Sequence, residues 1–295
     1  MADARDPFDS AFLQRLEYLR IVSRRMAAGA GAGRRTGRRT GPGLEFAEHR
    51  AYVPGDDFRH IDWAAFGRLE RLLLRLCQQE EDLGIDFLLD ASASMATGRP
   101  AKVDHARRLA AALAYVGLAS LDRVRLFGVD AGVRAHVAAG RDKAHVLAIL
   151  DFLRGLAAEG PTDLARSVEG YLPHAPRPGL VVIVSDLMDP AGYQKPLTLL
   201  ASRGFEAWCL HVTDPADLAP GGTGDLAVTD AETGDTLGVH LSDALRVRLA
   251  AEADRFAAEA RAWCLSRGIG YAEAPTRIPA DALVLDVLRR GGLVQ

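Results

Sequence analysis

The sequence is poor in cysteine and in lysine, and the cysteine pattern excludes two classes of site. Its 295 residues include three cysteines, Cys77, Cys209 and Cys264, and none of them forms a C-x-x-C pair. A zinc ribbon and a thioredoxin-type redox site are therefore excluded. Only 3 of the 36 basic residues are lysine, which we attribute to genomic bias and not to function.

Long apolar runs are also missing. The longest segment without a charged residue, Leu109–Leu121, has 13 residues, whereas a helix that spans a bilayer needs about 20. The first six residues include three acids or bases and no apolar segment follows them, which is unlike a signal peptide. We therefore expect no transmembrane segment and a cytoplasmic location.

Several catalytic and nucleotide-binding signatures are absent. There is no Walker A loop and no G-x-G-x-x-G fingerprint, so the sequence does not support nucleotide hydrolysis or dinucleotide binding. A G-x-S-x-G elbow and an H-E-x-x-H motif are missing too, which argues against the corresponding serine hydrolases and metalloproteases. If an ATPase takes part in the function, it is another chain.

The sequence does contain a regular alternation of strand and helix patterns, on a composition that is 48% hydrophobic and 25% charged. Such a composition is typical of a globular protein. Strand patterns lie at 85–90, 124–129, 133–137, 180–185, 207–212 and 269–272, and helical patterns at 102–120, 143–156, 162–172, 190–202, 242–266 and 279–290. This alternation predicts an α/β fold whose mostly parallel sheet is covered on both faces. A polar hairpin is expected at 226–241.

The first 80 residues differ from the rest. Residues 8–26 show apolar positions at helical spacing, and Gly29–Gly43 is a Gly- and Arg-rich loop. Seven arginines and no acid lie between Arg20 and Arg39; such a run can contact RNA, but no aromatic residue interrupts it, which favours a solvated arm. We predict an N-terminal helical and β-rich extension over 1–80, followed by the α/β domain over 81–295.

Candidate ligands for a metal ion follow two of the predicted strands and precede one helix. Asp90, Ser92 and Ser94 alternate after the first strand of the domain, Thr162 opens a helix, and Asp186 follows the Val-rich strand. In open α/β sheets, ligands bind at the carboxyl ends of the strands. Three hydroxyls and two carboxylates supply oxygen ligands for Mg²⁺ or Mn²⁺. The set is low in charge, so the metal remains able to accept a carboxylate from outside.

A simpler interpretation of the same residues stays open. Asp and Ser directly after a strand commonly cap the next helix or form Asx turns. The presence of oxygen donors in two further loops favours the metal site over capping alone.

The five residues resemble the metal-ion-dependent adhesion site (MIDAS) of von Willebrand factor A domains. Asp90, Ser92 and Ser94 match its first loop, Thr162 its second and Asp186 its third. The resemblance implies a Rossmann-like domain that binds an acidic residue of a partner through the metal.

A second resemblance covers roughly residues 37–190. The segment 45–63 contains Pro-Gly-Asp-Asp-Phe-Arg-His-Ile-Asp-Trp and precedes the strand that leads to the Asp-Ala-Ser-Ala-Ser-Met loop. This order is similar to that of a bacterial family known as domain of unknown function number fifty-eight. Its members are typically encoded beside MoxR-type AAA+ ATPases, which implies a chaperone-like or assembly role with such a partner. Within the block we expect Asp57 or Asp62 to hold Arg59, and Trp63 to be an apolar anchor.

These observations predict a non-enzymatic, metal-dependent protein-interaction adaptor. Two alternatives remain. The metal could activate water for phosphoester or peptide hydrolysis, with Asp163, Asp186 or Asp189 as base. The arginine-rich arm could make the chain an RNA-binding scaffold, although we expect no nucleic-acid partner.

Overall fold

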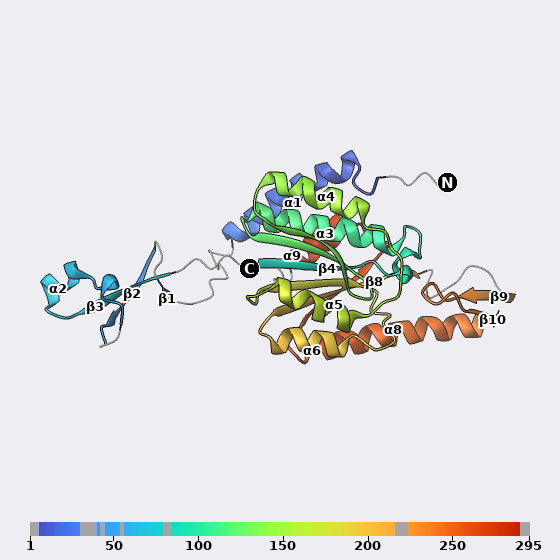
Figure 1. The fold of residues 1–295 in the computed structure, drawn as a ribbon. Helices are drawn as coiled ribbons and strands as arrows, with labels where there is room; N and C mark the ends of the chain where they lie inside the picture. Colours follow the sequence, from blue (N-terminus) through green and yellow to red (C-terminus); the bar gives the residue numbers. More distant parts are fainter. Residues whose placement is uncertain are drawn as a thin grey trace. The chain divides into compact units, whose positions relative to one another are not determined.

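The structure is a computed structural model that describes residues 6–29, 40–41, 45–53, 56–78, 84–215 and 224–289 (Figure 1). The chain forms two compact units: a larger one made of residues 1–26 and 84–294, and a smaller one of residues 27–83. Most of the predicted Gly- and Arg-rich loop, including four of its arginines, lies outside the described residues.

A six-stranded sheet forms the centre of the larger unit. Its strands are, in spatial order, β11 (Gly270–Pro275), β8 (Glu206–Thr213), β7 (Leu180–Ser185), β4 (Gly84–Asp90), β5 (Arg123–Val129) and β6 (Val133–Gly140). All neighbouring strands are parallel except β5 and β6. Strand β7 is buried along its whole length, as expected of a central strand covered on both faces. The predicted α/β fold with a mostly parallel sheet is confirmed.

Helices cover both faces of this sheet (Figure 1). One face carries α1 (Ser10–Gly29), α3 (Lys102–Ala119), α4 (Lys143–Gly155) and α9 (Ala280–Arg289). The other carries α5 (Leu164–Tyr171), α6 (Gln194–Ser202) and α8 (Asp243–Leu265). Because side chains alternate along a strand, Phe87 and Leu89 pack into the first core while Leu88 packs into the second.

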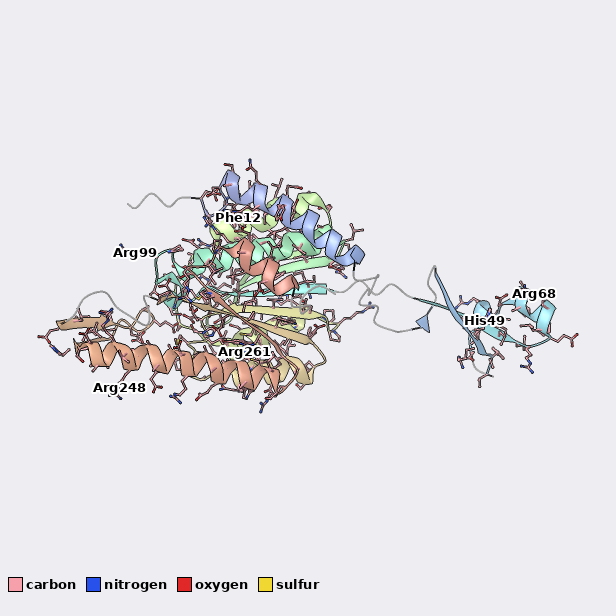
Figure 2. All side chains as sticks on the ribbon, turned by 180° about the vertical axis from the view of Figure 1, so that it is seen from behind. Phe12, His49, Arg68, Arg99, Arg248 and Arg261 are labelled. Atoms are coloured by element: carbon pink, nitrogen blue, oxygen red, sulfur yellow. The ribbon has the colours of Figure 1, made fainter. Side chains whose placement is uncertain are left out.

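Helix α1 belongs to the larger unit, which differs from the predicted boundary at residue 80. Its apolar positions Phe12, which Figure 2 labels, Leu16 and Leu19 are buried in the same core as α3. The Arg108 side chain of α3 donates a hydrogen bond to the Pro7 carbonyl at 2.7 Å. The periodicity of residues 8–26 predicted the helix, but it could not indicate which part of the chain the apolar stripe would contact.

The smaller unit contains an antiparallel sheet of order β1 (Thr40–Gly41), β3 (Leu73–Gln78) and β2 (Glu45–Ala51), together with the short helix α2 (Trp63–Leu69). Asp57 holds Arg59 through an ion pair of 2.8 Å, as predicted. Asp62 instead caps α2 by accepting the Ala65 N–H, and it also contacts His49, which Figure 2 labels. The expectation that Trp63 is an apolar anchor is wrong for this unit, because the side chain is 62% exposed.

Candidate functional site

The candidate site lies where the direction of the sheet connections changes. Strand β4 is the first strand of this sheet in sequence. Strand β5 pairs with one edge of β4, and β7 pairs with the other edge. Such a switch point leaves a crevice at the carboxyl ends of the strands, and ligands of open α/β sheets bind there. The loops after β4 and β7 both leave the sheet at this edge.

The loop after β4 brings its three predicted donors together. Asp90 ends the strand and is fully buried, and one of its carboxylate oxygens accepts the Ser92 N–H at 3.0 Å. The hydroxyl oxygens of Ser92 and Ser94 are 3.0 Å apart. These groups lie close together as expected from the sequence, although Ser92 precedes and Ser94 lies in a 3-10 helix, Ala93–Ala96, and not in an extended turn.

Hydrogen bonds connect this loop to the loop that carries Thr162. The Ala93 N–H donates to the Gly160 carbonyl and the Glu159 N–H donates to the Ala91 carbonyl, both at 2.8 Å. Beyond Thr162, the Leu164 N–H donates to the Asp189 carboxylate of the third loop at 2.7 Å. These contacts hold all three predicted loops against one another at one edge of the sheet.

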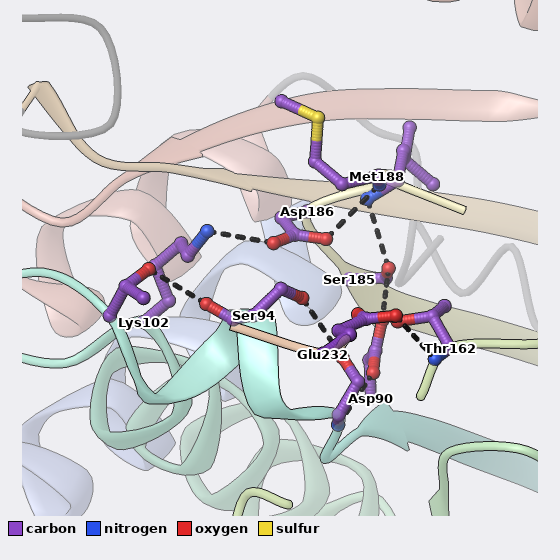
Figure 3. A network of polar contacts seen from close by, with 11 residues as sticks. Asp90, Ser94, Lys102, Thr162, Ser185, Asp186, Met188 and Glu232 are labelled. Atoms are coloured by element: carbon purple, nitrogen blue, oxygen red, sulfur yellow. Dashed lines mark hydrogen bonds and ion pairs between the residues drawn. The ribbon is translucent and has the colours of Figure 1, made fainter. Parts of the chain in front are cut away.

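The loop after β7 places a second carboxylate beside Asp90. The last residue of β7, Ser185, donates its hydroxyl to the Asp90 carboxylate at 2.5 Å (Figure 3) and accepts the Leu187 N–H at 3.0 Å. Leu187 adopts a left-handed backbone with φ 59°, and the next residue, Met188, donates its N–H to Asp186 at 3.1 Å. Sequence analysis did not single out Ser185, although it directly precedes a predicted donor.

Lys102 is a second residue that sequence analysis missed. Its ammonium nitrogen lies 2.7 Å from an Asp186 carboxylate oxygen (Figure 3), and the two side chains are only 3% and 2% exposed. A buried charge must be paired to be tolerated, so each of these residues accounts for the burial of the other. The available sequence signal was a lysine at the start of a mostly apolar helix, in a chain with only three lysines.

The two buried carboxylates of the site influence each other. Burial, and then repulsion from the Asp186 carboxylate, raise the pKa of Asp90 to about 6, and the hydrogen bond from Ser185 opposes this rise. A divalent cation bound between the carboxylates would lower that pKa by favouring the ionised form.

An unexpected third acid, Glu232, contacts Thr162. The Thr162 hydroxyl donates to one carboxylate oxygen of Glu232 at 2.6 Å, and the Thr162 N–H donates to the other at 2.9 Å (Figure 3). Glu232 lies in the turn between β9 (Gly224–Thr229) and β10 (Thr236–Leu241), the hairpin that the sequence predicted. Sequence analysis gave this glutamate no role.

Two of the proposed donors, the Ser92 and Ser94 hydroxyls, have a spacing that suits a hard divalent cation. Within the described residues, no three His, Cys, Asp or Glu side chains gather as a metal-binding group, so the fit depends on hydroxyls. Ligands at right angles around Mg²⁺ are about 3 Å apart, given metal–oxygen distances of 2.0–2.1 Å. The separation of the Ser92 and Ser94 hydroxyls, 3.0 Å, meets this requirement.

Asp163 and Asp189, two of the acids proposed as catalytic bases, accept hydrogen bonds from backbone N–H groups. Asp163 caps α5 by accepting the Arg166 N–H at 2.8 Å. Asp189 accepts the Leu164 and Ala191 N–H groups, each at 2.7 Å. Asp90 and Asp186 each accept the N–H two residues further on, from Ser92 and Met188, as the Asx-turn alternative expects. Unlike Asp163 and Asp189, they also contact Ser185 and Lys102.

Comparison with known families identifies the chain. It belongs to the family described as "Protein of unknown function DUF58", which matches residues 48–259. The resemblance drawn from the block at 45–63 is thereby confirmed at the level of the family.

Relatives and similar structures are known from several bacteria. "Uncharacterized protein Rv1480" of Mycobacterium tuberculosis is 30% identical over 254 residues, which are 83% of this chain and 77% of the relative. "Uncharacterized protein Mb1516" of Mycobacterium bovis gives the same values. The crystal structure of the conserved hypothetical protein BatB from Bacteroides thetaiotaomicron matches with a TM-score of 0.45 and 13% identity, over 72% of this chain and 98% of that one.

Among the described residues, no helix combines the length and the apolar content that crossing a bilayer requires.

Proposed function

We propose that this member of the DUF58 family is a non-enzymatic adaptor with a MIDAS-like site of the von Willebrand factor A type. Asp90, Ser92, Ser94, Thr162 and Asp186 would hold Mg²⁺ or Mn²⁺. The metal would supply an electrophilic centre that binds a carboxylate of a partner protein. The adaptor would act in the cytoplasm.

The balance of charge at the rim carries this proposal. Of the five donors, only Asp90 and Asp186 are acidic, and the Lys102 ammonium lies 2.7 Å from Asp186. The two carboxylates balance the charge of a divalent cation, and the Lys102 ammonium then leaves the site with a net charge of +1, which a carboxylate of a partner would compensate. Met188, half-exposed in the loop after β7, offers an apolar contact beside the rim.

The alternatives receive less support. A hydrolase needs a base that is free to take a proton from water. Asp163 and Asp189 both accept backbone N–H groups, and Asp186 accepts the Met188 N–H and pairs with Lys102. The arginine-rich run proposed to bind RNA extends into residues outside the described part of the chain. We therefore favour the adaptor over both.

A MoxR-type AAA+ ATPase, or a client of that ATPase, is the partner we propose. Its support is the family resemblance of the sequence. An ATPase on a separate chain also agrees with the lack of a Walker A loop here.

Metal binding can be tested directly by calorimetric titration of the purified chain with Mg²⁺ and Mn²⁺. We expect Asp90→Asn and Ser94→Ala to weaken the affinity at least 10-fold, because each removes an oxygen ligand or its charge. Ser202→Ala, on the exposed end of α6, is the matched control and should bind like wild type. Unchanged Mg²⁺ affinity in Asp90→Asn would contradict the proposed site.

Partner binding can be tested by affinity purification from the native host. We expect wild type to retain an AAA+ ATPase or its client in Mg²⁺ and to lose it in EDTA, and we expect Asp90→Asn to retain none. Capture of the same protein by both chains, with or without EDTA, would exclude a metal-dependent adaptor.

A further inference from the structure

Glu232 meets the site in the way that the carboxylate of a partner would. Both of its carboxylate oxygens accept hydrogen bonds from Thr162, at 2.6 Å from the hydroxyl and 2.9 Å from the backbone N–H. The shorter of these separations is close to the spacing of about 3 Å between adjacent ligands of Mg²⁺. An oxygen of Glu232 therefore lies about where a neighbouring ligand of a Thr162-bound metal belongs.

The turn that carries Glu232 is ordered by its own hydrogen bonds. The Asp230 carboxylate accepts the N–H groups of Glu232 and Thr233 at 2.8 and 2.9 Å. The Asp230 N–H donates to the Asp235 carbonyl at 2.8 Å, which closes the turn. Glu232 is thus presented by a preformed loop, and the entropy lost when it contacts Thr162 is correspondingly small.

The β9–β10 hairpin is only weakly attached to the rest of the larger unit. Strands β9 and β10 form a sheet of two strands, and most of their residues are exposed. A two-stranded hairpin has little stability of its own, and this one buries little apolar surface against the rest of the unit. Moving its tip away from Thr162 would leave the central sheet and its two cores intact.

We infer that Glu232 is the carboxylate ligand of this site in the free chain, and that an acidic partner binds by displacing the β9–β10 hairpin. This inference rests on the proposed function and adds an internal competitor to it. The hairpin then sets a threshold for binding: a partner must offer a carboxylate that binds better than Glu232 does in its preformed turn.

The test compares the full-length wild type with Glu232→Ala and with Asp225→Asn. The last variant removes a charge from the same hairpin at a residue that contacts His240 and not Thr162. Each chain is loaded with Mn²⁺. The amount of bound Mn²⁺ is obtained from the loss of the electron paramagnetic resonance signal of the free ion. Acetate is the carboxylate probe. Broadening of its methyl signal in the proton NMR spectrum by bound Mn²⁺ shows that acetate can reach the metal.

We expect Glu232→Ala to increase the acetate broadening at least 5-fold over wild type, and Asp225→Asn to match wild type. In metal-free samples, exchange of the Thr162 amide hydrogen should accelerate at least 10-fold in Glu232→Ala alone, because its acceptor is lost.

Two failures can be told apart. If Mn²⁺ binds all three chains while acetate broadening and Thr162 exchange do not differ, the role of Glu232 is overturned and the metal site stands. If Mn²⁺ binds none of them, the proposed function is overturned, and the ligand role of Glu232 with it.

Discussion

At the scale of single residues, the candidate site is governed by the pairing of buried charges. Asp90 and Asp186 repel each other, and the pKa of Asp90 rises to about 6 mainly through burial. Lys102 compensates Asp186 at 2.7 Å, and the Ser185 hydroxyl supports Asp90 at 2.5 Å. The site therefore contains an internal cation, in addition to the groups that would bind a metal ion.

The first prediction concerns this internal cation. Lys102→Met keeps most of the side-chain volume but leaves the buried Asp186 carboxylate unpaired, which typically costs about 3–5 kcal/mol. We expect urea unfolding in EDTA to show a loss of stability of this size. We also expect tighter Mg²⁺ binding than in wild type, because the carboxylate becomes free to bind the metal, so that Mg²⁺ restores part of the lost stability.

Lys195→Met provides the control, since Lys195 is exposed on α6. It should leave both stability and Mg²⁺ affinity unchanged. Weaker Mg²⁺ binding in Lys102→Met would show that the ammonium supports the metal site and does not compete with it.

Sequence patterns predicted part of this chemistry. The spacing of Asp90, Ser92 and Ser94 predicted that they converge in an extended turn, and the structure brings the two hydroxyls together at the start of a 3-10 helix, Ala93–Ala96. Lys102 and Glu232 were missed because their contacts join positions 84 and 70 residues apart in the chain. No local pattern reports which distant side chains will meet.

At the scale of helices and strands, the proposed metal ligands are positioned by three loops: those that follow β4 and β7, and the one that carries Thr162. The predicted strand and helix patterns recur as β4 to β8, β11 and the helices between them, with ends that differ by a few residues. The site then depends on backbone hydrogen bonds between loops, such as Ala93 N–H to the Gly160 carbonyl at 2.8 Å. Gly160 can make this contact because its φ of 85° lies in the left-handed region that glycine tolerates.

The second prediction follows from that backbone conformation. A Cβ atom at Gly160 meets no atom closer than 3.5 Å, so Gly160→Ala introduces backbone strain without a steric clash. We expect a loss of stability of about 1 kcal/mol and weaker Mg²⁺ binding, since Thr162 is two residues further on. Urea unfolding and calorimetric titration measure the two effects.

Gly155→Ala is the matched control. This exposed glycine ends α4, and a Cβ atom there meets no other atom within 4 Å. The same substitution should leave stability unchanged or raise it slightly, because alanine favours a helix over glycine. Equal losses of stability in Gly160→Ala and Gly155→Ala would show that the left-handed backbone of Gly160 is not what makes its substitution costly.

At the scale of the whole molecule, the larger unit is discontinuous in sequence. Residues 27–83 form a unit of their own, inserted between α1 and β4. Helix α1 and the residues just before it contact three helices of the larger unit. Arg108 of α3 lies over the Phe12 ring and Asp281 of α9 pairs with Arg15, while Arg154 of α4 lies over the ring of Phe8, which precedes α1. Composition and periodicity could not predict this arrangement, because they do not report long-range packing.

The third prediction tests the contribution of α1 to the larger unit. Leu16 is 2% exposed and Leu13 is 39% exposed on the same helix. Leu16→Ala leaves a cavity in the core beside α3, so we expect it to lower the free energy of unfolding by about 3 kcal/mol. Leu13→Ala should cost less than about 1 kcal/mol, since its side chain is partly in water already.

Chemical denaturation of both variants, followed by circular dichroism, makes this comparison. Because helices other than α1 supply most of the circular dichroism signal, a full effect of Leu16→Ala also requires that α1 unfold together with them. Equal losses of unfolding free energy in Leu16→Ala and Leu13→Ala would mean that the buried face of α1 does not stabilise the core of the larger unit.

The inserted segment has a consequence for synthesis on the ribosome. Phe12, Leu16 and Leu19 emerge first, but their partners on α3 lie in residues 102–119, which are translated only after the whole insertion. Contacts between such distant parts of a chain form slowly. The apolar stripe of α1 must therefore stay in the nascent chain without its final partner, which gives a ribosome-associated chaperone a reason to cover it.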